Sequence, residues 1–173
     1  MSQTPGSMAP ASPAPAGAAP EQRACLFALA DSRFAVDVRS AREVVLFDDI
    51  TAVPLAPRYL VGVANLRGTV MPIVDIRAML GLPESRPARS VRTLVVRHGG
   101  VQVAMVVDAV LGLEPFDDVM APDGPTTARM RGPRPLMAGW IRWAGETLAL
   151  LDVPKILTAL RPSMPTGAQE VSA

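Results

Sequence analysis

The segment 58–82, RYLVGVANLRGTVMPIVDIRAMLGL, constrains the fold of this chain more than any other. It holds two apolar runs rich in β-branched residues, Leu60–Leu66 and Thr69–Ile76, separated only by Arg67-Gly68. Runs of this kind are typical of strands, and a dipeptide ending in glycine between two of them is typical of a tight reversal. The segment therefore predicts an antiparallel hairpin.

Single residues give this hairpin further features. Gly68 can take the positive φ that a tight reversal requires, while Asn65 and Arg67 place an amide and a permanent cation beside it. Gly62 interrupts the first run, which indicates either a bulge or the close approach of another backbone segment. Pro72 has no N–H to donate, which indicates an edge or bulge position in the second strand.

Short apolar runs predict strands along most of the remaining chain as well. In the first two of them, 25–30 and 33–38, Phe27, Leu29, Phe34 and Val36 recur with the period of two that a half-buried strand requires. Besides the central hairpin, the predicted elements are strands at 25–30, 33–38, 43–47, 91–97, 101–107, 109–116, 137–142 and 147–151, helical turns at 76–80, and a closing helix at 153–160 capped by Asp152.

The order of these runs repeats, which predicts two units in succession. About ten short strands fall into two halves that meet at the polar segment 83–90, and closing each sheet into a small barrel removes exposed strand edges. We therefore expect an all-β domain over residues 23–162 with short helices, one of them C-terminal. Residues 1–22, rich in proline and alanine, and residues 163–173 are expected to be disordered tails.

The charge balance limits the classes of partner. With 17 basic and 16 acidic side chains the net charge is +1, so there is no general electrostatic attraction to nucleic acid or to an anionic membrane. No run approaches the ~18 apolar residues of a membrane span, so direct membrane insertion is not expected. A protein partner in the cytoplasm fits this composition better.

Residues with reactive chemistry occur singly. Cys25 lies in an apolar run and is interpreted as a core residue, and His98 lies in a turn-like sequence without a partner for a metal. The Asp48-Asp49 pair is typical of a loop more than of an acid–base site. Because nucleotide-binding and nucleophile motifs are missing too, we expect no enzyme activity, cofactor or metal. Three arginines of the predicted loop 122–135 could hold phosphate, although a solvated loop is favoured: Arg129, Arg131 and Arg134.

The run Gly62–Gly68, followed by Met71–Asp75, resembles the core motif of CheW-like domains, the coupling proteins of bacterial chemosensory arrays. Ala28–Val38 is similar to the opening hairpin of that family, Val106–Val110 to its Val-Asp-x-Val segment, and Leu148–Leu157 to its ending. The likeness covers nearly all of residues 24–160. The chain departs from the usual family pattern at Ala64, at Ala104 and in the loop around Met130.

This resemblance implies two SH3-like five-stranded barrels that connect methyl-accepting receptors to a CheA-type histidine kinase without catalysis. The first barrel would bind the regulatory domain of the kinase, and the groove between the barrels would hold the cytoplasmic tip of the receptor. Self-association in array rings, with attachment to the membrane only through partners, is also implied. An adaptor or a ligand or peptide sensor in a non-flagellar pathway, controlling pili, development or a second messenger, stays open as an alternative.

The resemblance also implies a set of partner-binding residues by motif position: Ala41, Glu43, Gly62, Asn65, Leu66, Arg67, Gly68, Val110 and Leu113. We expect Arg67 to form a bidentate ion pair with Glu43. The alternatives are that Arg67 only solubilises a turn, that the two glycines only serve the backbone, and that Val110 and Leu113 belong to the core.

Overall fold

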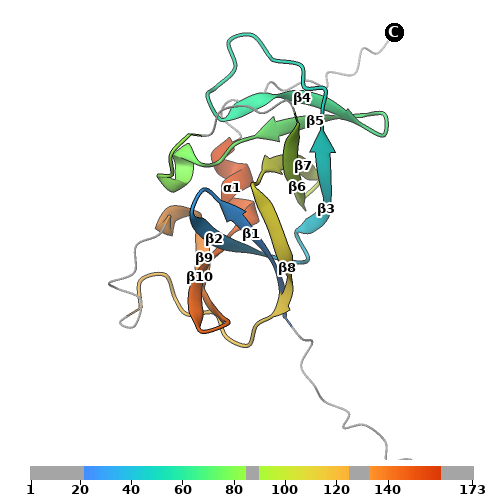
Figure 1. Cartoon of the computed structure of the whole chain (residues 1–173). Coiled ribbons are helices and arrows are strands. Elements are labelled where there is room, and N and C mark those ends of the chain that lie inside the picture. Colours follow the sequence, from blue (N-terminus) through green and yellow to red (C-terminus); the bar gives the residue numbers. More distant parts are fainter. Residues whose placement is uncertain (1–21, 85–89, 125–132, 161–173) are drawn as a thin grey trace, which may run out of the picture.

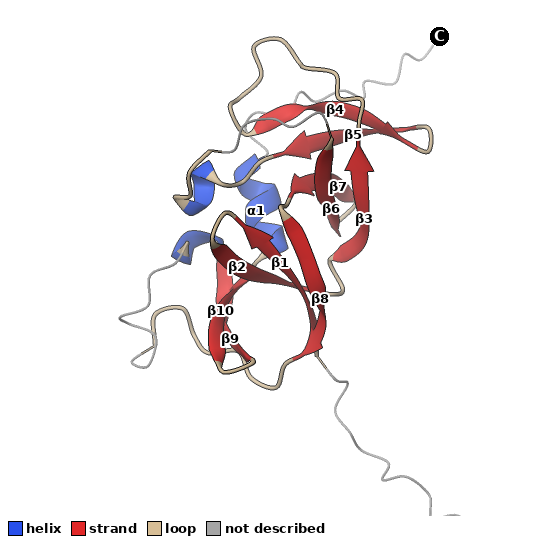
Figure 2. Cartoon of the chain, viewed as in Figure 1, coloured by secondary structure: helices blue, strands red, loops and turns tan. Residues whose placement is uncertain are grey.

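Two five-stranded sheets make up the fold, and their strands are interleaved along the chain. The structure is a computed structural model that describes residues 22–84, 90–124 and 133–160. Sheet A has the strand order β8-β1-β2-β10-β9, and sheet B has the order β3-β6-β7-β5-β4. Both sheets are strongly curled, with sheet B above sheet A and the helix α1 beside them in Figure 1, and strands dominate the chain in Figure 2.

The elements follow one another with short connections, apart from three longer segments, 48–59, 81–90 and 116–133. Their bounds are β1 (Arg23–Leu29), β2 (Ser32–Asp37), β3 (Ala41–Phe47), β4 (Leu60–Leu66), β5 (Thr69–Val74), the 3₁₀ turn η1 (Ala78–Leu80), β6 (Val91–His98), β7 (Val101–Val106), β8 (Ala109–Pro115), the 3₁₀ turn η2 (Arg134–Leu136), β9 (Met137–Trp143), β10 (Glu146–Leu151) and α1 (Val153–Leu160).

The all-β prediction is confirmed, but the predicted boundary near 83–90 does not separate the two sheets. That stretch falls between β5 and β6, which both belong to sheet B. The first two strands instead complete sheet A, where β1 pairs with β8 and β2 pairs in parallel with β10. Apolar periodicity predicts where strands lie, but it does not say which distant strands pair. Residues 1–21, 161 and 162, and 163–173 lie outside the described residues, so the two tails stay predictions.

The two sheets nevertheless follow one plan. An edge strand, a long connection, a hairpin and a helical segment occur in the order β3-β4-β5-η1 and again in the order β8-β9-β10-α1. The hairpin turns also match, with φ values of 51° and 87° at Arg67 and Gly68 and of 47° and 81° at Ala144 and Gly145. The internal repeat therefore exists, but its second copy is completed by β1 and β2 from the start of the chain.

A glycine at the same place in each hairpin lets the long connection press against a strand. A Cβ atom added at Gly62 would lie 2.5 Å from the carbonyl oxygen of Thr51, and one added at Gly139 would lie 2.4 Å from that of Met120. Both connections are held there by isolated β-bridges. The close approach predicted at Gly62 is confirmed, and the β4–β5 ladder shifts register beside it as a bulge would.

Pro72 occupies a position that the sequence predicted only in part. It does not lie on an edge strand, because β5 has β4 on one side and β7 on the other. The pairing with β7 is short, however, and involves only Ile73 and Val74. Pro72 precedes these two residues, so its missing N–H interrupts no ladder bond to β7.

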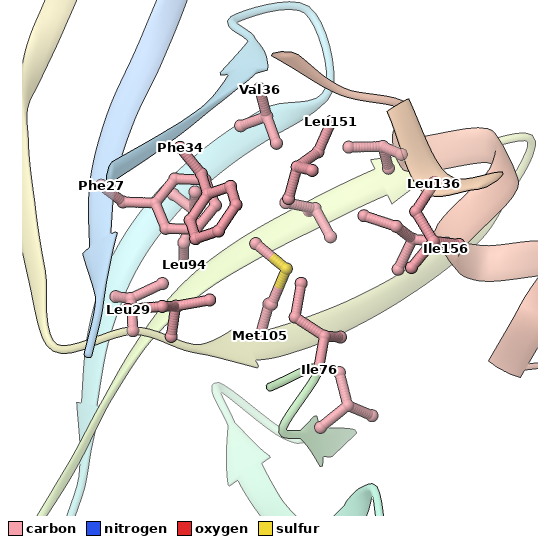
Figure 3. Packing of buried hydrophobic residues seen from close by; sticks show 14 of the residues in the cluster. Phe27, Leu29, Phe34, Val36, Ile76, Leu94, Met105, Leu136, Leu151 and Ile156 are labelled. Carbon is pink, nitrogen blue, oxygen red and sulfur yellow. The ribbon is translucent and has the colours of Figure 1, made fainter. Parts of the chain in front are cut away.

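The largest hydrophobic core lies between the sheets. Phe27 and Leu29 from β1 face Leu94 and Met105 from β6 and β7, and α1 adds Ile156 (Figure 3). Two smaller cores fill the inner faces of the individual sheets. Because the central space is filled by side chains of both sheets, the two sheets form one packed body.

Candidate functional site

The predicted ion pair between Arg67 and Glu43 is confirmed. The two guanidinium nitrogens of Arg67 lie 3.0 and 2.7 Å from the two carboxylate oxygens of Glu43. Arg67 sits at the tip of the β4–β5 hairpin and Glu43 on β3, and β4 and β3 stand at opposite ends of the strand order in sheet B. The ion pair therefore connects the two free edges of sheet B, where the curl would otherwise be open.

The hairpin tip has a fixed shape. The side-chain oxygen of Asn65 accepts a hydrogen bond of 2.7 Å from the backbone N–H of Gly68. Arg67 and Gly68 both have left-handed backbone angles, as a type I′ turn requires. Leu66 is half-buried and packs against the core of sheet B. These four residues and Glu43 form a single structural group, which we call the tip site.

The remaining predicted residues lie apart from the tip site. Gly62 is buried under the connection before β4 and offers no surface to a partner. Ala41 on β3 and Val110 on β8 are half-buried against the central core. Leu113 lies on β8 with 46% of its surface exposed. The predicted set is thus divided between sheet B and the edge strand β8 of sheet A.

Exposed apolar side chains on the edge strands were not predicted from the sequence. Val44 and Leu46 on β3 are 49% and 54% exposed, and Leu111 on β8 is 41% exposed. Together with Leu113 they form a group that we call the edge residues. On each strand they occupy alternate positions, so the period of two could have predicted that they share a face, although not that this face is open to solvent. Exposed apolar side chains on edge strands are typical of protein interaction sites.

Two cavities flank the region where the sheets meet. One, of about 830 Å³, is lined by residues of sheet B and by Asp108, and Leu46 of the edge residues borders it. The other, of about 820 Å³, lies against the β1–β2 hairpin and includes Leu111 in its lining. Both cavities therefore adjoin an edge strand that carries exposed apolar side chains.

Reactive side chains are placed as structural residues in the described part of the chain. Cys25 is buried in the central core, and burial raises the pKa of its thiol, which keeps it in the unreactive protonated form. Asp48 accepts a hydrogen bond from the hydroxyl of Ser90, and Arg134 pairs with Asp123. Arg129 and Arg131 lie outside the described residues. Within the described ranges no group of three potential metal ligands occurs, and no helix has the length and hydropathy to span a membrane.

Comparison with known proteins agrees with this geometry. The sequence profile of the CheW-like domain matches residues 23–161. The chain belongs to the CheW-like domain family. Protein FrzA of Myxococcus xanthus is 31% identical over 89% of this chain and 96% of its own length. The probable chemotaxis protein CheW of Rhizobium etli is 36% identical, but the match covers only 56% of this chain and 63% of that protein.

A solved structure supports the fold of this CheW-like domain. The scaffolding protein TtCheW from Thermoanaerobacter tengcongensis superposes with a TM-score of 0.66 at 24% identity, over 76% of this chain and 89% of that protein. Two of the three departures from the family pattern, Ala64 and Ala104, are 7% and 0% exposed and lie in the core of sheet B. The third, the loop around Met130, lies outside the described residues. The first two departures concern internal packing and not a surface that a partner would touch.

Proposed function

We propose that this CheW-like protein is a chemosensory adaptor that couples methyl-accepting receptors to a CheA-type histidine kinase by binding both, without catalysis. The observation that carries the proposal is the tip site, where the Arg67–Glu43 pair and the Asn65–Gly68 hydrogen bond hold an exposed guanidinium in one orientation. A surface cation held in this way is better suited to orienting a partner than to stabilising the fold, because exposed ion pairs contribute only about 0–1 kcal/mol to folding.

The edge residues supply the apolar part of the proposed contact. Leu46 and Leu113 belong to different sheets, so a partner that covers both edge strands would contact sheets A and B together. The apolar faces of a receptor's helical tip match such a surface, because helices bind to proteins through side chains at regular spacing. In this proposal the regulatory domain of the kinase binds at one sheet only, copies of the chain join rings, and the protein is held in cytoplasmic receptor arrays through its partners.

Replacing Arg67 with alanine is expected to leave the protein folded and to weaken partner binding. The free energy of unfolding should change by at most about 1 kcal/mol, because the ion pair is exposed. Affinity for the receptor tip or for the regulatory domain of the kinase should fall about tenfold, since an orienting charged contact is lost. The measurements are a denaturant melt and titration calorimetry with each purified partner.

Arg39 provides the matched control. It also forms an exposed bidentate ion pair, with Asp37, but it lies in the turn between β2 and β3 and not in the β4–β5 hairpin tip. Arg39→Ala should leave both affinities unchanged, and exchanging the charges by Arg67→Glu with Glu43→Arg should restore the pair but not the binding. An unchanged melt combined with unchanged binding of both partners by Arg67→Ala would refute the role of the tip site.

The adaptor proposal itself is tested by mixing the protein with the regulatory domain of a CheA-type kinase from the same cell and measuring the mass of the complex. Concentration-dependent complex formation, together with binding to a receptor-tip fragment, is the expected result. If neither partner binds at micromolar concentrations, the proposed function is wrong.

A further inference from the structure

A buried arginine links the two sheets through carboxylates. The side chain of Arg77 is 2% exposed, although arginine is rarely buried unless it is paired. One guanidinium nitrogen lies 2.7 Å from a carboxylate oxygen of Asp75, and the other lies 2.6 Å from a carboxylate oxygen of Asp108. Burial of the guanidinium opposes its charge, but the hydrogen bonds and charges of Asp108 and Asp75 outweigh this effect and raise the pKa of Arg77.

Asp108 occupies the point at which the chain passes from sheet B to sheet A, between β7 and β8. Its second carboxylate oxygen accepts a hydrogen bond of 2.6 Å from the backbone N–H of Ala30, in the β1–β2 turn of sheet A. Its own N–H donates to the carbonyl oxygen of Ala28, and its carbonyl oxygen accepts from Arg92 of β6 in sheet B. Asp108 thus has direct partners in both sheets.

Arg77 and Asp75 follow directly after β5, in sheet B. The continuous path therefore runs from β5 through Arg77 and Asp108 to the β1–β2 turn. Each side-chain contact along this path is a short hydrogen bond that involves a charged group. The strength of such a bond depends on its direction as well as on its length. The apolar attraction that packs the central core, in contrast, is non-directional.

Stability alone does not explain such a network. The guanidinium of Arg77 is buried, whereas the carboxylates of Asp75 and Asp108 are 22% and 46% exposed. A charge removed from water in this way loses in desolvation much of what it gains in Coulomb attraction, and apolar residues of similar volume often replace a buried ion pair without loss of stability. A fixed mutual orientation of the sheets is the property that the charged network provides and that apolar side chains would not.

We propose that Arg77 and Asp108 are positioning residues that lock the two sheets at one mutual angle, so that edge strands β3 and β8 are presented together to a partner that covers both. This inference rests on the proposed function for the identity of that partner, the helical tip of a receptor. The lock itself is a property of the chain alone, and it is measurable without any partner.

The test measures the distance between the sheets in a conservative variant. Arg77→Lys keeps one positive charge but loses the fork that reaches two carboxylates at once. Spin labels are attached to cysteines introduced at Val70 on β5 and Ala138 on β9, both exposed, in a Cys25→Ala background. Double electron–electron resonance should give a narrow distance distribution for the labelled protein that keeps Arg77. For the labelled Arg77→Lys variant the distribution should be at least twice as broad.

Binding is measured on the same variants at a temperature where each is fully folded by circular dichroism. Affinity of Arg77→Lys for the receptor tip should fall at least tenfold, whereas affinity for the regulatory domain of the kinase, which needs one sheet, should change less than twofold. Arg33→Lys is the matched control, because Arg33 pairs with Glu146 inside sheet A. This substitution should change neither the distance distribution nor the binding.

Asp108→Asn gives a second, nearly isosteric way to weaken the lock if Arg77→Lys does not fold. Distance distributions that stay narrow in a folded variant of Arg77 or Asp108 overturn the lock, whatever happens to binding. If the distributions broaden as expected but the unsubstituted protein binds no receptor tip, the lock is supported and the proposed function is wrong.

Discussion

Replacing Phe27 with alanine is expected to lower the free energy of unfolding by about 3–5 kcal/mol, the usual cost of removing a fully buried phenylalanine side chain. Phe27 is 0% exposed in the central core, with the ring of Phe34 6.0 Å away. The side chains of sheet B that face Phe27 cannot fill the cavity left by its ring, because the β6–β7 ladder fixes the backbone that carries them. Urea titration of the two proteins measures the difference.

The same experiment reports whether the sheets unfold together. Both tryptophans of the chain, Trp140 and Trp143, lie on β9 in sheet A, so their fluorescence follows sheet A alone. Circular dichroism follows both sheets. The two signals should give the same midpoint before and after the substitution, because the central core belongs to both sheets. Val70→Ala, at a position 71% exposed, should cost less than about 0.5 kcal/mol. Separate midpoints, or a loss below about 1 kcal/mol with Phe27→Ala, would contradict a shared core.

Replacing Gly62 with alanine is expected to cost about 3 kcal/mol, at the upper end for an added methyl group. The new Cβ would lie 2.5 Å from the backbone oxygen of Thr51 and 2.7 Å from a methyl carbon of Ile50, so a backbone segment has to move. Gly139→Ala should behave alike in sheet A, because its Cβ would meet the backbone oxygen of Met120. Denaturant melts of the two variants give both values.

Gly99→Ala separates the effect of space from the effect of backbone angle. Gly99 has a φ of 54° and nothing within 4 Å of an added Cβ, so only the left-handed backbone is penalised, at about 1 kcal/mol. A cost for Gly62→Ala no larger than that for Gly99→Ala would mean that the connection before β4 does not press on the strand.

Local chemistry made most of the elements predictable from the sequence. The Arg67-Gly68 reversal was predicted because glycine accepts positive φ, and the start of α1 was predicted because Asp152 can accept from the helix. In the structure, the carboxylate of Asp152 accepts a hydrogen bond of 3.0 Å from the backbone N–H of Lys155. The pairing of β2 with β10 was not predictable in this way, because a parallel ladder between the two ends of a chain leaves no local signal.

The tip site was predicted better than the rest of the contact surface. Glu43 and Arg67 were predicted to pair because an exposed cation and a carboxylate on a neighbouring strand attract each other, and family likeness named both. In the structure they lie on the two opposite edge strands of the curled sheet B, which the sequence did not predict. Arg77 was missed because the apolar residues around it suggested a helical turn, in which a charged side chain is expected to face solvent. A charge that directly follows a buried strand, as in the Asp75-x-Arg77 sequence, was the available signal.

The interleaved order of the strands also determines when each sheet can form during synthesis. Sheet B is made from the uninterrupted stretch 41–106, so all its strands are available as soon as β7 has left the ribosome. The β1–β2 hairpin emerges first but has no permanent neighbours until β8 and β10 are translated. During that interval its apolar faces are uncovered, and a chain released early would carry one finished barrel and one hairpin that is open to aggregation.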